Sequence, residues 1–139
     1  MEQFTKDRSG KSPVTFTGKL LAASYGRYAH SRDNNRWHDI EVFRTAAGSY
    51  VTVILFQTHW QGEQNRSEVE VSNTAEEAAR ILETYDPTDG YCRGPEYPGM
   101  AGKTFADRDT RTMKDLRDRY QAQVSEVLST SAEFQERID

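Results

Sequence analysis

The segments Arg36–Thr45 (RWHDIEVFRT) and Tyr50–Trp60 (YVTVILFQTHW) decide the fold, because both are strand-like and both carry apolar residues on two faces. The connection between them, Ala46–Ser49 (AAGS), contains a glycine and predicts a tight turn, so the two segments are expected to form a β-hairpin. A strand that is apolar on one side can leave its other side in water. A strand that is apolar on both sides must be covered twice or must bind a partner.

A four-residue turn would pair Thr45 with Tyr50, and this pairing sets the register of the hairpin. In that register, one face is aliphatic and the other is aromatic. The aliphatic face contains Ile40, Val42, Val51, Val53 and Leu55. The aromatic face contains Trp37, Phe43, Tyr50, Phe56 and Trp60. We expect the aliphatic face to lie in the core, and the aromatic face to lie under the C-terminal helix or to bind a partner.

Strand patterns continue on both sides of the hairpin. Pro13–Tyr25 precedes it as a strand in which Gly18 indicates a bulge or close packing. Arg66–Ser72 follows it, with valines alternating with glutamates, as is typical of an edge strand that is wet on one side. Thr74–Glu77 (TAEE) is a capping box that opens a helix, and the Asp86-Pro87 pair ends that helix.

The sequence therefore predicts an α+β fold, a four-stranded antiparallel sheet (a meander) followed by a helix, a long Pro/Gly loop and a long C-terminal helix. The chain of 139 residues is long enough for one core, which favours a single domain. Residues 1–12 are predicted to be a flexible polar arm, and residues 13–139 a single α+β domain. Within the domain we expect the sheet over 13–72, the helix over 73–85, the loop over 86–104 and a helical region over 105–139.

Composition and charge exclude several classes of protein. The net charge of -4 and a pI of about 5.4 disfavour a general nucleic-acid binder, which usually carries a basic surface. No apolar run approaches the roughly 18 to 20 residues of a membrane helix, and the polar N-terminus has no signal region. The single cysteine, Cys92, excludes an internal disulfide and a zinc site built from several cysteines. We expect a cytoplasmic protein without a membrane association.

Three patterns hint at chemistry, and each is incomplete. Gly102-Lys103-Thr104 resembles the end of a phosphate-binding loop, but Tyr97 stands where that motif needs glycine. His38 and His59 would lie on one face of the hairpin and could share a metal, although a third ligand is missing. Cys92 has no identifiable base. We therefore expect no catalytic residue, no metal and no cofactor, and we predict that the protein is not an enzyme.

Arginine and aromatic residues alternate between Tyr25 and Trp37, and this pattern is typical of surfaces that bind partners. The alternative interpretation is a solvated connection between two strands. The predicted partner-binding residues, including one from the Pro/Gly loop, are Tyr28, Arg32, Arg36, Trp37 and Tyr97.

The order FTGKLLA (16–22), RWHDIEVFRT (36–45), GSYV (48–51) and THWQGE (58–63) resembles short uncharacterised accessory proteins of bacterial plasmids and integrative elements. The resemblance spans about residues 14–82, rests on a strand pattern and transfers no functional residue. It implies a context, because mobile elements of plasmid or phage type carry small non-enzymatic proteins that block host defences, anti-CRISPR proteins among them.

The first hypothesis is therefore a small non-enzymatic protein-binding inhibitor or accessory factor of a mobile element, of the anti-CRISPR type, acting on a host protein or ribonucleoprotein complex. A homodimer through the aromatic face is a further expectation. The alternative is a single-stranded nucleic-acid-binding protein that uses the aromatic face and the Arg/Tyr loop, as Whirly-type and PUR-type domains use a sheet face, although the net charge disfavours it. An enzyme built on Cys92 or Lys103 is the third hypothesis.

Overall fold

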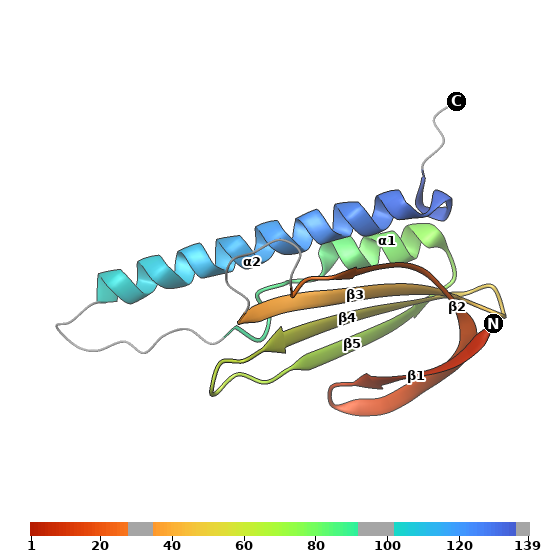
Figure 1. Ribbon diagram of the computed structural model, residues 1–139, viewed down its shortest axis with the longest axis horizontal. Coiled ribbons are helices and arrows are strands. Elements are labelled where there is room, and N and C mark those ends of the chain that lie inside the picture. Colours follow the sequence, from red (N-terminus) through yellow and green to blue (C-terminus); the bar gives the residue numbers. More distant parts are fainter. Residues whose placement is uncertain (28–34, 92–101, 136–139) are drawn as a thin grey trace.

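The computed structural model describes residues 1–27, 35–91 and 102–135, which form a curved antiparallel sheet with helices on one face (Figure 1). The strands are β1 (Glu2–Arg8), β2 (Lys11–Tyr25), β3 (Arg36–Thr45), β4 (Tyr50–Thr58) and β5 (Arg66–Ser72). The helices are α1 (Ala75–Thr84), α2 (Gly102–Thr130) and the short 3₁₀ helix η1 (Ala132–Phe134). The α+β class and the antiparallel meander are confirmed.

The sheet has five strands in the order β1-β2-β3-β4-β5, so the predicted number of four is wrong. The additional strand lies in residues 1–12, which the sequence assigned to a flexible arm. Phe4 pairs with Phe16 across β1 and β2, and Gly10, with a φ of 73°, makes the tight turn between the two strands. The arm was predicted because its other residues are polar, and most of them do face solvent while Phe4 packs inward.

β2 is long and strongly curved, and its two halves pair with different strands (Figure 1). The half before Gly18 pairs with β1 and the half after it pairs with β3. Gly18 itself faces Glu2 on one side and Thr45 on the other. A Cβ atom at this position would lie 2.4 Å from the carbonyl oxygen of Arg44, so the expected close packing at Gly18 is confirmed.

The bend in β2 carries the β1–β2 hairpin over one face of β3 and β4, while the helices cover the other face. The core under the helices contains Ala22, Ile40, Val42, Ile54, Leu82, Tyr120, Val124 and Val127. The core inside the curved sheet contains Phe43, Val51, Val53 and Val69, packed against Phe4, Val14, Phe16 and Leu55. Both apolar faces of the central hairpin are therefore covered within one chain.

The register of the central hairpin differs by one residue from the prediction, because Arg44 rather than Thr45 pairs with Tyr50. Thr45 ends β3 and closes the turn to β4, since its N–H donates to the Ser49 carbonyl (2.9 Å) and its hydroxyl accepts from the Ser49 N–H (3.0 Å). The slip moves each residue of β4 to the opposite face relative to β3.

The predicted aliphatic and aromatic faces are therefore wrong. Phe56 packs on the helix side of β3, whereas Phe43 lies in the core inside the sheet. Four of the five residues assigned to the aromatic face are buried, and only Trp60, beyond the end of β4, is exposed. The exposed aromatic sheet face that was expected to mediate a homodimer is therefore not present in the part of the chain that the structure describes.

The helix boundaries follow local signals. The Thr74 hydroxyl accepts from the Glu77 N–H (3.1 Å) while Glu77 accepts from the Asn73 N–H (3.0 Å), so the capping box is confirmed. α2 begins at Gly102, three residues before the predicted start. Across the part of the chain that the structure describes, no helix is long and apolar enough to cross a membrane.

We expect Gly18→Ala to lower the free energy of unfolding by roughly 2 kcal/mol, because the new methyl group would force the backbones of β2 and β3 apart. Urea denaturation measures the change. Lys19→Ala, an exposed substitution on the same strand, is the control and should change stability by less than about 0.5 kcal/mol. Equal stability of the two variants would show that the close contact is not a constraint.

Candidate functional site

β3 begins and β4 ends at the same end of the sheet (Figure 1). Arginine and aromatic side chains gather there. The residues come from four separate stretches of chain, and ring contacts join them into two neighbouring groups. We call this set the arginine–aromatic cluster. It contains Arg27, Arg36, Trp37, His59, Trp60 and Tyr91.

Arg36 is the centre of the cluster. Its guanidinium group donates to both carboxylate oxygens of Glu63, with Nε–Oε1 at 2.9 Å and Nη2–Oε2 at 2.7 Å. The same group lies 5.0 Å from the Trp60 ring centroid and 4.5 Å from that of Tyr91. The Thr58 hydroxyl also donates to Glu63 (2.8 Å). Arg36 is thus held by a two-pronged ion pair and by two aromatic rings.

Trp37 points to the other side of β3 and is only 8% exposed. Its ring packs edge-on against His59, with centroids 5.0 Å apart, and the Arg27 guanidinium lies 5.2 Å from it. Burial raises the pKa of the neighbouring Asp39, although hydrogen bonds from the Gly26 backbone, Trp37 and Gln57 oppose this shift. Trp37 is therefore the buried residue of the cluster that contacts both His59 and Arg27.

The structure brings two of the predicted partner-binding residues together, and both are largely buried: Arg36 and Trp37 are each 8% exposed. Tyr28, Arg32 and Tyr97 lie outside the described residues. Trp60, which is 48% exposed, was placed on the aromatic face but was not named among the predicted partner-binding residues. The sequence signal that could have identified Trp60 was the turn after β4, which contains Gly62. In the structure Gly62 adopts a φ of 89°, and the turn brings both Trp60 and Glu63 into contact with Arg36.

The two histidines suggested as a metal pair are separated by β3. His38 is buried among the rings of Phe56, Tyr85 and Tyr120, whereas His59 contacts Trp37 on the opposite side. Within residues 1–27, 35–91 and 109–135, no group of three or more histidine, cysteine or acidic side chains could hold a metal ion. Cys92 and the side chain of Lys103 lie outside the described residues.

α2 contributes buried polar side chains that bind the first residues of β3. The Arg119 Nη1 donates to the Arg36 carbonyl (2.9 Å), and the Gln123 amide donates to the His38 carbonyl (2.8 Å). At the start of the described α2 side chains, Asp109 accepts a hydrogen bond from the Tyr91 hydroxyl. The helix therefore fixes both the strand and one of the rings that frame Arg36.

Comparison of the chain with protein-family models, with curated proteins and with solved structures finds no match. The chain is thus a small α+β protein with a curved five-stranded sheet and the arginine–aromatic cluster at one end.

Glu63→Gln should lower the free energy of unfolding by about 3 kcal/mol, because it leaves the nearly buried Arg36 charge without its counter-ion. Chemical denaturation at neutral pH measures the loss. The matched control is Glu70→Gln on the exposed face of β5, which should change stability by less than about 0.5 kcal/mol. Similar values for the two variants would contradict a structural role for the ion pair.

The pH dependence of stability should report on His38. Burial, together with the nearby Arg119 charge, lowers the pKa of His38 from 6.5 to about 4, although a hydrogen bond to the backbone of Pro87 opposes the shift. Between these two pH values the unfolded chain takes up a proton that the folded chain does not. The contribution of His38 to the free energy of unfolding is therefore fully present above pH 6.5 and is lost as the pH drops towards 4.

We expect this loss to reach roughly 3 kcal/mol and to be absent from His38→Phe, whose ring does not titrate. Urea unfolding of both proteins at several pH values gives the comparison. An unchanged pH profile in His38→Phe would exclude His38 as its source.

Proposed function

We propose that this protein is a non-enzymatic protein-binding factor, an inhibitor or accessory protein of the anti-defence type that mobile elements carry, and that the arginine–aromatic cluster contacts a host protein or ribonucleoprotein complex. One observation carries the proposal: Trp60 is 48% exposed while its ring stacks on an arginine that is itself fixed by Glu63 and Tyr91.

Tryptophan and arginine are the residues most enriched where binding energy concentrates in protein interfaces. A large ring that is already held in place loses little conformational freedom when a partner binds, so more of its contact area contributes to affinity. Trp60 meets both conditions, because the Arg36 guanidinium holds its position and half of its surface stays open to a partner.

The nucleic-acid alternative loses its main surface. It required an aromatic sheet face on which bases could stack, and four of the five side chains assigned to that face, all but Trp60, are buried. Single-stranded nucleic acid would then have to bind at the cluster itself, through Arg27 and Trp60. The net charge of -4 favours a protein partner over a polyanion.

The test compares Trp60→Ala with the wild-type protein in affinity purification from host cells followed by mass spectrometry. The partner that the wild type recovers is then purified, and its dissociation constant is measured for each variant. We expect Trp60→Ala to weaken binding at least about tenfold, as loss of a central aromatic contact usually does. Leu20→Ala, which removes a side chain of similar exposure (45%) from β2, should bind like the wild type.

Thermal unfolding of both variants controls for loss of the fold. If Trp60→Ala and Leu20→Ala bind the partner equally well, the cluster is not the interface. If no protein is recovered and oligonucleotides bind with a strong dependence on salt, the nucleic-acid alternative replaces the proposal.

A further inference from the structure

β5 lies at one edge of the sheet (Figure 1), and its first part is bound on the outer side by the turn between β1 and β2. The Ser67 N–H donates to the Ser9 hydroxyl (2.8 Å), and the Ser67 carbonyl accepts from the Ser9 N–H (2.9 Å). The backbone groups of Ser67 therefore point away from β4. Because the residues of a strand point these groups to alternate sides, those of Val69 and Val71 point outward as well.

The outward backbone groups of Val69 and Val71 are open. Across residues 1–27, 35–91 and 102–135, no backbone or side-chain group forms a hydrogen bond with them. The side chain of Val71 is also 58% exposed. Two free N–H groups and two free carbonyls thus lie beside an exposed valine, and we call residues 69–71 the open edge. An extended peptide can add to such an edge as a further strand.

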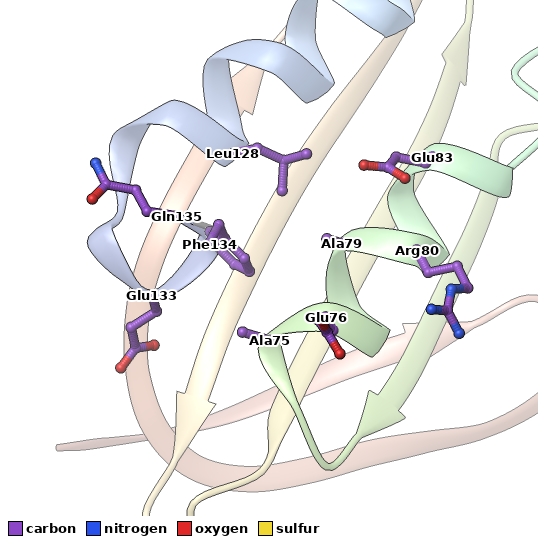
Figure 2. Close-up of a pocket in the computed structure, with 9 residues that line it drawn as sticks. All are labelled: Ala75, Glu76, Ala79, Arg80, Glu83, Leu128, Glu133, Phe134 and Gln135. Carbon is purple, nitrogen blue, oxygen red and sulfur yellow. The ribbon is translucent and has the colours of Figure 1, made fainter. Parts of the chain in front are cut away.

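The helix side of the open edge is acidic. A hollow of about 340 Å³ lies there between β5 and α1, and four carboxylates line it: Glu68, Glu70, Asp86 and Asp89. Among the described residues, neither lysine nor arginine lines this hollow. Arg80 of α1 lines a separate hollow, between α1 and η1 (Figure 2).

Two of these four carboxylates have a basic neighbour. Arg66 pairs with Asp89 across 3.2 Å, although about half of each side chain is exposed. Hydrogen bonds from Thr88 and the charge of Arg117 lower the pKa of Asp86, although burial opposes this shift. These two acids therefore contribute less than their full charge to the hollow.

Glu68 and Glu70 are the acids whose charge is not compensated. Neither forms an ion pair in the part of the chain that the structure describes. Burial and the charges of Glu70 and Asp89 raise the pKa of Glu68 more than Lys11 and Arg66 lower it. A basic side chain on a strand added beside them would therefore be attracted.

A second copy of the chain fits this edge poorly. In a two-fold antiparallel pair centred on Glu70, two glutamates lie opposite each other, and with the centre one residue earlier Glu68 lies opposite Glu70. Like charges directly opposite each other destabilise a pair of strands. A pair centred on Val71 requires the N–H of Asn73, which already donates to Glu77 (3.0 Å). The charge pattern favours a different, basic chain.

We propose that the open edge of β5 is a second docking site, and that its occupant is an extended segment of a partner protein in which lysine or arginine alternates with apolar residues. The segment adds a sixth strand to the sheet. Its apolar side chains lie beside the two valines of the edge, and its basic side chains lie beside Glu68 and Glu70.

The open edge is distinct from the arginine–aromatic cluster. Val71 pairs with Val51 near the start of β4, whereas Trp60 lies beyond the end of β4. The two surfaces can therefore be tested separately.

The test uses a hexapeptide of alternating lysine and valine with blocked ends, titrated into the intact ¹⁵N-labelled protein. We expect the amide signals of Val69 and Val71 to shift most, because their open N–H groups gain acceptors. The matched control peptide alternates glutamate with valine and should bind at least about tenfold more weakly. Added salt should weaken the binding of the lysine peptide.

Methylation of the peptide nitrogens separates strand addition from simple charge attraction. One form of the lysine peptide is methylated at its valines and another at its lysines. Since N–H groups alternate along a strand, one form loses the donors that face β5 and the other loses donors that face away. We expect one methylated form to lose binding and the other to bind like the unmodified peptide.

Two variants test the edge from the side of the protein. Val71→Pro removes an outward N–H without removing a bond to β4, and proline is tolerated at such edge positions. It should weaken the lysine peptide at least about tenfold, whereas the control Val71→Thr keeps the N–H and should bind like the wild type. Glu68→Lys combined with Glu70→Lys should prefer the glutamate peptide. Circular dichroism and thermal unfolding verify that the variants fold.

Four outcomes would overturn the proposal. The first is the absence of shifts at Val69 and Val71, and the second is equal binding of the lysine and glutamate peptides. The third is equal binding of the two methylated forms. The fourth is a dimer of the wild type that Val71→Pro converts to a monomer, since the occupant would then be a second copy of the chain. None of these outcomes depends on the effect of Trp60→Ala.

Discussion

The close approach of Gly18 to the carbonyl oxygen of Arg44 is the constraint on which the rest of the fold depends. Without a side chain at this point, β2 can turn and pair with β1 along one half and with β3 along the other. The turn places Phe4 and Phe16 against Phe43, with ring centroids 4.6 and 5.1 Å from it. A hairpin that is apolar on two faces is covered in this way by one chain, without a partner.

This arrangement decides where binding can occur. Both faces of the central hairpin are used for folding, so the surfaces left for other molecules lie elsewhere, the ends of its strands among them. Loops at the end of a rigid sheet commonly carry function for the same reason, because they can vary without disturbing the core. The arginine–aromatic cluster occupies such an end.

Local features of the fold could be predicted from the sequence. The capping box at Thr74 needs only residues within one turn of helix, and both of its hydrogen bonds are present. The boundaries of β3 were also predicted correctly, since the change from alternating apolar residues to AAGS is visible in the chain. The register of the hairpin was predicted incorrectly. In the structure the Thr45 hydroxyl binds the Ser49 backbone, so Arg44 rather than Thr45 pairs with Tyr50.

Features that depend on distant residues could not be predicted. The predicted register places Glu41 on the face opposite the aliphatic side chains Ile40 and Val42, Val51, Val53 and Leu55. In the structure it does share a face with the last three of these, because Lys6 and Tyr25, on two other strands, bind its carboxylate at 3.1 and 2.8 Å. The burial of Arg36 has the same origin, since it depends on Glu63, which lies 27 residues further along the chain.

α2 connects the start of β3 to α1 through buried polar side chains. Arg119 and Gln123 bind the carbonyls of Arg36 and His38, while the Tyr120 hydroxyl donates to the Leu82 carbonyl of α1 (2.7 Å). Apolar residues in the first two places would remove a buried hydrogen bond from each of these carbonyls, although the His38 carbonyl would still accept from the Gly26 N–H. These polar groups therefore join the start of β3, where the arginine–aromatic cluster lies, to α2 and through it to α1.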